Sequence, residues 1–241
     1  MQTIPLTNLA LTFLPVGIVI IILHRWSLGS GTAAYSVLRM LVQLLLIGYV
    51  LTYIFETERS LVVLAVLAVM LVVSSWIALR PLARKGQRVY SKMFFSISLG
   101  GITTLALIST AVLNLDPWFA PNMMIPLAGM IFANSMNTAS VAAERFESER
   151  KTIDYKQARQ RAMNAAMIPV INSMFAVGLV SLPGMMTGQI LSGVDPLIAV
   201  RYQVMVMCMI FGSAGISAAC YLWLMNGGEN LEENSRAAGT P

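Results

Sequence analysis

Long apolar stretches fill most of this chain, and short polar stretches separate them. A helix needs about 20 apolar residues to cross about 30 Å of hydrocarbon. Residues 61–79, 93–113 and 202–225 reach that length without one charged side chain. The pattern predicts an all-α, polytopic bundle of six or seven transmembrane helices. The apolar segments are roughly residues 4–23, 36–55, 61–79, 93–113, 123–143, 165–192 and 198–225.

One apolar segment, residues 165–192, is too long for a simple span and contains Pro169 and Pro183. Proline removes a backbone donor and breaks or kinks a helix. Irregular backbone at membrane depth is tolerated only beside protein or a wet cavity. We expect either a short helix followed by a span, or a broken helix that lines a pathway. The residues of the expected hinge or break are Ser181, Leu182, Pro183, Gly184 and Gly188. The two glycines, four residues apart, would also permit a close helix contact.

Lys and Arg gather in two loops, residues 80–92 and 145–161, and the loop between them, residues 114–122, has none. Cytoplasmic loops of membrane proteins are enriched in these two residues. Both basic loops should therefore lie in the cytoplasm, with the N-terminus outside and the C-terminus inside. Residues 1–225 are expected to form a single transmembrane domain, and the polar residues 226–241 a disordered cytoplasmic tail.

Composition supports a membrane location. The chain is 57% hydrophobic and 11% charged, whereas a soluble domain carries about 25% charged residues. The net charge of +5 is accounted for by the two basic loops and does not indicate a nucleic-acid partner. We therefore expect a multi-pass protein of the cell inner (plasma) membrane, surrounded by the lipid bilayer.

Sequence motifs for catalysis are missing from the chain. It has no G-x-x-x-x-G-K-[ST] phosphate loop, no H-E-x-x-H and no C-x-x-C, and His24 is its one histidine. An enzyme is not expected, and no cofactor is expected to bind this chain. The 17 methionines either fill gaps in helix packing, which is the favoured interpretation, or supply soft metal ligands. The sequence leaves the metal ligands unknown.

Polar side chains at membrane depth are candidates for a substrate path, because such groups are costly in lipid. Asn134 and Asn137 share one face of a predicted helix with Met130. Asn172 and Ser173 lie in the interrupted segment. All of these side chains either hold helices together or line a substrate path.

Asp195 precedes Pro196. The first interpretation of this pair is a helix N-cap, because aspartate accepts from the first free backbone N–H groups and proline suits the first helical position. The alternative is a carboxylate that attracts cations at a pore mouth.

Residues 144–164 differ from the rest of the chain, because they combine charges of both signs with helix-forming residues. They form either a plain solvated loop or a docking surface for a soluble partner. Their length, and the interrupted segment that follows, favour docking, with a short helix between two spans that transmits the movement of a motor. The expected coupling residues are Glu144, Arg145, Glu147, Lys156, Gln157, Ala158 and Arg161.

Three stretches carry a more specific resemblance. Val177 to Ala199 reads V-G-L-V-S-L-P-G-M-M-T-G-Q-I-L-S-G-V-D-P-L-I-A, Met124 to Asn134 reads M-I-P-L-A-G-M-I-F-A-N, and Val42 to Phe55 reads V-Q-L-L-L-I-G-Y-V-L-T-Y-I-F. Together they resemble the FetB family of ABC transporter permeases.

The resemblance implies a membrane subunit that works with a separate ATPase, in an assembly of two permeases and two ATPases. ATP and Mg²⁺ would bind in the partner, which agrees with the missing phosphate loop. Bacterial members are implicated in iron export, and plant relatives in aluminium tolerance, with a nucleotide sugar proposed as a substrate. One departure concerns the ATPase contact. The family's Gly-Ala coupling motif is absent here, where the sequence reads Thr152-Ile153-Asp154-Tyr155-Lys156-Gln157-Ala158.

Iron export driven by a partner ATPase is thus the leading hypothesis. The alternatives are an ABC permease for another substrate, such as a nucleotide sugar, a carrier or channel without a motor, and a scaffold without a substrate path. A motor-free carrier should have paired ionisable residues at the membrane midplane. Nearly all acidic residues of this chain fall in the predicted loops instead.

Overall fold

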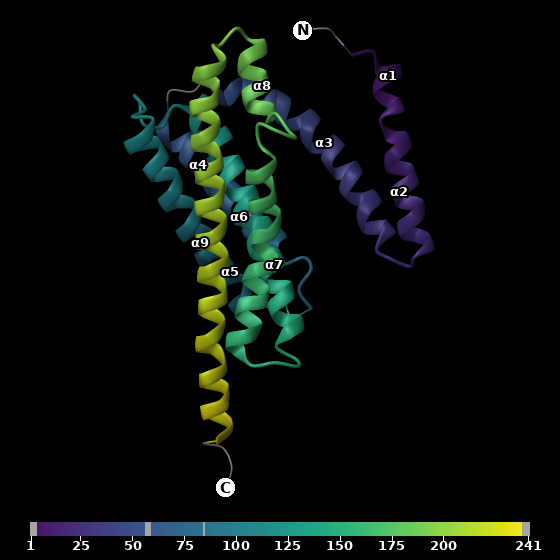
Figure 1. The fold of residues 1–241 in the computed structure, drawn as a ribbon, viewed down its shortest axis with the longest axis vertical. Helices are drawn as coiled ribbons and strands as arrows, with labels where there is room; N and C mark the ends of the chain where they lie inside the picture. Colours follow the sequence, from purple (N-terminus) through teal and green to yellow (C-terminus); the bar gives the residue numbers. More distant parts are fainter. Residues whose placement is uncertain (1–3, 56–58, 84, 238–241) are drawn as a thin grey trace. The chain divides into compact units, whose positions relative to one another are not determined.

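Helices form almost all of the computed structural model, which describes residues 4–55, 59–83 and 85–237, without the side chains of Thr52 and residues 227–237. In these residues the chain contains no strand, only an isolated bridge between Val177 and Ser181. The helices are α1 (Leu6–Leu11), α2 (Phe13–Arg25), α3 (Ser30–Phe55), α4 (Ser60–Ala78), α5 (Gln87–Leu107) with the π-helical turn η1 (Ile108–Val112), α6 (Pro121–Glu149), α7 (Tyr155–Ala176), α8 (Gly184–Leu191) and α9 (Pro196–Ala237) (Figure 1). The all-α prediction is confirmed for the described residues.

The chain divides into two compact units. Unit 1 contains α1 to α3, and unit 2 contains α4 to α9. The backbone remains helical to Ala237, inside the segment expected to be a disordered tail, and residues 238–241 lie outside the described residues. That the two units belong to one membrane domain stays a prediction.

Five helical stretches of the described chain are long and apolar enough to cross a membrane. They are Leu6–Arg25, Ser30–Phe55, Ser60–Ala78, Gln87–Val112 and Pro196–Asn226. The segments expected at 123–143 and 165–192 do not reach this standard of length and hydropathy. The multi-pass prediction holds in this coarser form, and the number of spans and the orientation stay predictions.

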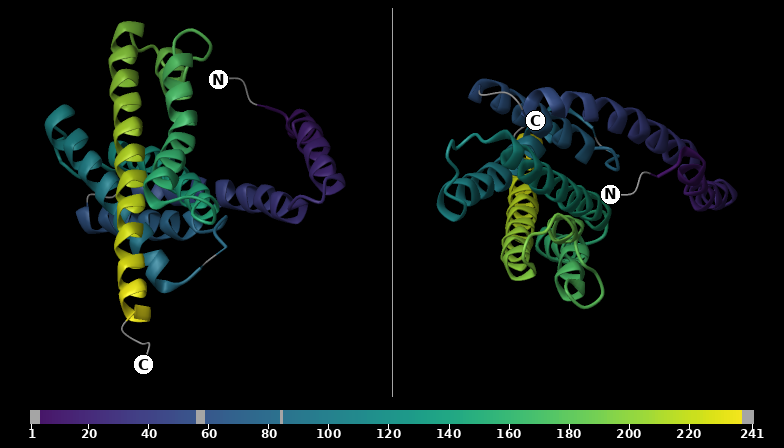
Figure 2. Two further views of the ribbon diagram at one scale, coloured as in Figure 1. Left: turned by 60° about the horizontal axis from the view of Figure 1, so that its bottom comes forward. Right: turned by 90° about the horizontal axis from the view of Figure 1, so that it is seen from above.

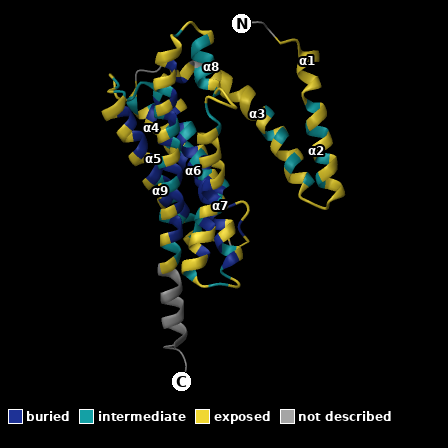
Figure 3. Cartoon of the chain, in the orientation of Figure 1, coloured by how far each residue is buried: buried dark blue, intermediate teal, exposed yellow. Residues whose placement is uncertain are grey.

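Unit 1 is apolar, yet almost none of its described residues are buried. Thr12 separates α1 from α2, and no residue of either helix is buried. Figure 3 shows α1 to α3 almost entirely in the colours of exposed and intermediate residues. Helices that are apolar on all sides need apolar surroundings, which for this unit a bilayer would supply.

Unit 2 is built around α6, which packs against α4, α5, α7 and α9. Its buried side chains include Leu127, Ile131 and Ala139. The long helix α9 runs beside α7, as the views in Figures 1 and 2 agree. Since protein covers α6 on several sides, its sequence does not need the uniform hydropathy of a helix that faces lipid.

Close packing in unit 2 depends on glycines of α5. A Cβ on Gly100 would collide with the Ser217 side chain and with the Ser213 carbonyl of α9, and one on Gly101 would collide with the Phe132 ring of α6. Small residues of this kind let membrane helices approach closely. A Cβ on Gly184 or Gly188, by contrast, would meet nothing within 4 Å. No described part of the chain fills the space beside these two glycines, so the close helix contact that they permit stays a prediction.

Three buried serines of unit 2 donate hydrogen bonds to carbonyl groups of their own helices. Ser74 and Ser75 both donate to the Leu71 carbonyl, at 2.9 and 2.8 Å. Ser96 donates to the Lys92 carbonyl at 2.7 Å. This local bonding satisfies a polar side chain without a neighbouring helix.

The interrupted segment is broken as predicted, at one of the two expected prolines. α7 ends at Ala176, and α8 begins at Gly184 after Pro183. Gly178 has φ of +83°, a conformation that favours glycine, and its N–H donates to the Ser181 carbonyl at 2.9 Å. Pro169 lies inside α7 and does not end it. That part of the prediction was wrong, because a helix loses only one donor and bends slightly at an internal proline.

A candidate coupling site at the α6–α7 turn

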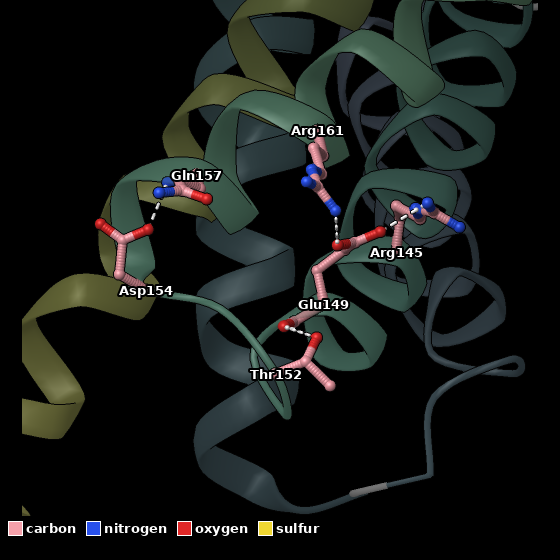
Figure 4. A network of polar contacts seen from close by, with 6 residues as sticks. All are labelled: Arg145, Glu149, Thr152, Asp154, Gln157 and Arg161. Carbon is pink, nitrogen blue, oxygen red and sulfur yellow. Dashed lines mark hydrogen bonds and ion pairs between the residues drawn. The ribbon is translucent and has the colours of Figure 1, made fainter.

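The α6–α7 turn joins two long helices directly. α6 ends at Glu149 and α7 begins at Tyr155. The expected short helix between two spans is absent from the described residues, and a turn of residues 150–154 takes its place. Contacts within the turn explain the difference, because they close the chain over a few residues (Figure 4).

Glu149 is the centre of these contacts. Its carboxylate pairs with Arg145, one turn earlier on α6, at 2.5 Å, and with Arg161 of α7 at 2.9 Å. The glutamate side chain is 9% exposed, whereas those of the two arginines are 48% and 57% exposed. A carboxylate this deeply placed needs partners. The pair with Arg161 fixes the start of α7 against the end of α6.

Hydrogen bonds complete the turn. The N–H groups of Thr152 and Ile153 both donate to the Glu149 carbonyl at 3.0 Å. The Asp154 carboxylate then accepts from the Gln157 N–H at 3.2 Å and caps α7. Aspartate is among the preferred N-cap residues. The order D-x-x-Q was a readable helix-start signal, and it marks where α7 begins.

Apolar packing ties the same turn to α9. Tyr155 meets the Phe146 ring edge-on, with centroids 5.7 Å apart, and its hydroxyl donates to the Leu222 carbonyl at 2.7 Å. Buried small side chains let α6, α7 and α9 approach each other here. The buried members of this cluster are Ala142, Phe146, Ala158, Ala162, Ala166, Ala218 and Leu222.

The other basic loop, residues 80–92, lies at the same end of unit 2 as the α6–α7 turn. The Ala83 N–H, between α4 and α5, donates to the Glu147 carboxylate of α6 at 3.1 Å. Ser140 of α6 donates to the Ala78 carbonyl of α4 at 2.9 Å. The loops that sequence placed on one side of the membrane therefore share one end of unit 2, called the basic end below.

Most of the expected coupling residues lie at the surface of the basic end. Ala158 is different, because it has no exposed surface and packs within the cluster below the turn. Its side chain packs the turn and offers no surface to a partner in this structure, and its coupling role stays a prediction. The exposed residues of the set are Glu144, Arg145, Lys156, Gln157 and Arg161, and Glu147 is half-buried.

The candidates for a substrate path do not converge. The Asn134 amide donates to the Met130 carbonyl of its own helix at 2.8 Å. Ser173 donates to the Val170 carbonyl at 2.7 Å. Asn137 and Asn172 are exposed. Among the described residues no hydrogen bond joins the α6 candidates to the α7 candidates. Whether these side chains line a substrate path or hold helices together stays open.

Asp195 is an N-cap, as its first interpretation held. Its carboxylate accepts from the N–H of Leu197 at 2.8 Å and of Ile198 at 3.4 Å, at the start of α9. Within the described chain, no three side chains of His, Cys, Asp or Glu gather in a way that could hold a metal ion. The metal ligands therefore remain unknown.

Comparison with known proteins adds the family. Residues 6–227 match the Uncharacterised protein family (UPF0014). The chain belongs to this family. Like other UPF0014 proteins it is a membrane protein, and no solved structure matches it.

Relatives of this UPF0014 protein occur in bacteria and plants. The chain is 34% identical to the probable iron export permease protein FetB of Escherichia coli, over 89% of each chain. It is 35% identical to the UPF0014 membrane protein slr1647 of Synechocystis, over 75% of this chain and 76% of the relative. It is 32% identical to the protein ALUMINUM SENSITIVE 3 of Arabidopsis thaliana, over 81% and 76%. The family resemblance drawn from the three sequence stretches is confirmed.

Proposed function

We propose that this chain is the permease subunit of an ABC transporter, and that it exports iron with ATP hydrolysed by a separate ATPase. The name of the relative FetB supports iron export. The absence of a phosphate loop in the sequence supports a separate ATPase. The single observation that carries the coupling role is the α6–α7 turn, where charged exposed side chains surround a buried, doubly paired Glu149.

A coupling element has to move as one body when a partner pushes it. The α6–α7 turn meets this requirement through two kinds of link. The pair of Glu149 with Arg161 ties α6 to α7, and the hydrogen bond from Tyr155 to Leu222 ties α7 to α9. A displacement of the turn would therefore reach three helices together.

The partner's contact surface is the exposed part of the turn. Lys156 and Gln157, in the first turn of α7, are exposed, and Arg145 keeps about half of its surface free. The working assembly contains two copies of this chain and two ATPases. The break between α7 and α8 is the deformable element that accompanies the alternation between inward and outward access.

The cargo is iron in this proposal, and Asn134 and Asn137 are the first residues to examine along its path. An ABC permease for a different substrate, such as a nucleotide sugar, and a carrier without a motor are the competing functions. The two competing functions differ in their need for an ATPase, because a motor-free carrier works without one and an ABC permease does not.

The test measures ATP hydrolysis in lipid discs that contain the chain copurified with candidate ATPases encoded near it. Iron, other metals and nucleotide sugars are added in turn. We expect stable copurification and stimulation by iron. Stimulation by a nucleotide sugar alone would keep the ABC assignment and replace the cargo. A well-folded, monodisperse chain that binds no ATPase would overturn the proposal in favour of a motor-free carrier.

A further inference from the structure

A groove of about 950 Å³ opens between α7 and α9, beginning at the basic end. Its volume lies at the upper end of the range for small-molecule sites. Its lining includes Arg159, Gln160, Asn164, Ile171, Phe211 and Trp223.

The groove changes from polar to apolar along its length. Arg159, Gln160 and Asn164 come from the first turns of α7, next to the α6–α7 turn. Further along α7 and α9 the lining includes Ile171 and Phe211. The site therefore offers charge and amide groups at one end and a hydrocarbon wall beyond it, which matches an amphiphile.

The charge at the polar end is positive, and none of the described carboxylates pairs with it. Arg159 stacks over the Tyr155 ring, 5.5 Å from its centroid. In the part of the chain that the structure describes, no carboxylate pairs with Arg159, and the groove lining contains no Asp or Glu. These features disfavour a metal cation in the groove and favour an anionic group, since guanidinium binds phosphate well.

The position of Trp223 sets the depth of the groove. This side chain is 66% exposed and lies three residues before Asn226, where the apolar span of α9 ends. Tryptophan is enriched at the level of lipid headgroups. The polar end of the groove would then face headgroups, and Phe211, three helical turns away on α9, would lie at the level of acyl chains.

We propose that this groove binds an anionic phospholipid of the leaflet at the basic end. The phosphate contacts Arg159, Gln160 and Asn164, and one acyl chain runs along Ile171 and Phe211. A second copy of this chain fits the groove less well, because it would bury the exposed Arg159 charge, which is costly. The proposal does not depend on the transport function above.

The first experiment counts lipids bound to the full chain by native mass spectrometry, with phosphatidylglycerol and phosphatidylcholine as probes. We expect phosphatidylglycerol to bind more tightly. Arg159→Gln should weaken the binding of phosphatidylglycerol on the order of tenfold, which is the loss of affinity expected when a hydrogen bond to a charged group is removed. Phosphatidylcholine should change less, and Arg159→Lys should keep most of the preference.

The matched control is Arg88→Gln, which removes an exposed arginine from the first turn of α5 at the same end. It should leave phosphatidylglycerol binding unchanged. A loss in Arg88→Gln equal to that in Arg159→Gln would overturn the proposal, because binding would then reflect only the general positive charge. Equal affinity of the wild-type chain for the two lipids would overturn it too.

A second experiment places the acyl chain. Bromine quenches tryptophan fluorescence at close range. Phosphatidylglycerol with brominated acyl chains should therefore reduce the fluorescence of the wild-type chain by more than that of Trp223→Phe. Quenching identical in the two proteins would mean that the lipid lies elsewhere. Release of all phosphatidylglycerol when the chain dimerises would show that a second copy occupies the groove, and the proposal would fail.

Discussion

At the scale of single residues, Glu149 shows how one carboxylate can set the geometry of a helical hairpin. It is almost buried, yet both of its arginine partners remain about half exposed. Water screens the outer parts of these pairs, so each contributes less than a fully buried pair would. The carboxylate itself still needs them, because an unpaired buried charge is costly.

Glu149→Gln should therefore destabilise unit 2 by about 1–3 kcal/mol, the range for a lost hydrogen bond to a charged group. Chemical unfolding in detergent measures the change. The matched control is Glu144→Gln on the same helix, an exposed position where we expect a change within about 0.5 kcal/mol. Equal effects at the two positions would show that the pairing with Arg161 contributes nothing.

Gly100 supports a second prediction at this scale. Gly100→Ala would place a methyl group against Ser217 and the Ser213 carbonyl, so α5 and α9 must separate, at a cost of about 1–3 kcal/mol. The melting temperature in detergent should fall. Gly212→Ala, on α9 where a Cβ meets nothing within 4 Å, should leave it unchanged. A stable Gly100→Ala protein would contradict the close contact of the two helices.

At the scale of elements, the α6–α7 turn separates packing from partner binding. Lys156 and Gln157 are exposed, so changing both should not disturb the fold. We expect Lys156→Glu with Gln157→Ala to weaken copurification with the ATPase about tenfold, or about 1.4 kcal/mol. The control is Arg201→Glu, a change at an exposed position in the second turn of α9, far from the basic end. Loss of ATPase binding in the control alone would move the docking site away from the turn.

The α7–α8 break gives another prediction for an element. Gly184 begins α8 and a Cβ there would meet nothing within 4 Å, so Gly184→Ala should change stability by less than about 0.5 kcal/mol. It should nevertheless reduce cargo-stimulated ATP hydrolysis, because alanine narrows the backbone freedom at the break. Stability and activity that fall together would show that Gly184 serves packing and not movement.

Some of these elements could be read from the sequence and some could not. The break within residues 165–192 was predicted from Pro183. The N-cap at Asp195 was predicted from the position of this residue before Pro196. The burial of Ala158 was missed because charged residues surround it in sequence. Its four-residue spacing with Ala162 and Ala166 was the signal, since that period marks one buried face of a helix.

At the scale of the whole molecule, five of the apolar stretches meet the standard of length and hydropathy, and the segments expected at 123–143 and 165–192 fall short of it. The first of these contains Asn134, Ser135 and Asn137, and the second is divided between α7 and α8. Hydropathy measures preference for lipid, whereas α6 lies against four other helices. Contacts of that kind depend on the tertiary structure and cannot be read from a window of sequence.

The orientation of the chain is testable at this scale. With Cys208 and Cys220 replaced by serine, Asn122→Cys and Ser148→Cys each provide a single exposed thiol, one at the start of α6 and one near the basic end. A membrane-impermeant maleimide should label position 122 in intact cells and position 148 only after the membrane is opened. The reverse pattern would place the basic end outside and contradict the charge rule on which the topology rests.

The distribution of hydrogen bonds in unit 2 has a mechanical consequence. In the described chain, the side-chain hydrogen bonds between its helices gather at the basic end, at Lys92, Ser140, Glu147, Glu149 and Tyr155. Inner serines such as Ser74, Ser75 and Ser96 instead bond within their own helices. Far from the basic end, the described helices of unit 2 can therefore slide or spread without breaking a side-chain hydrogen bond between them. Unit 2 would thus be stiff at the basic end, where a partner would bind, and its helices would be free to separate at the opposite end.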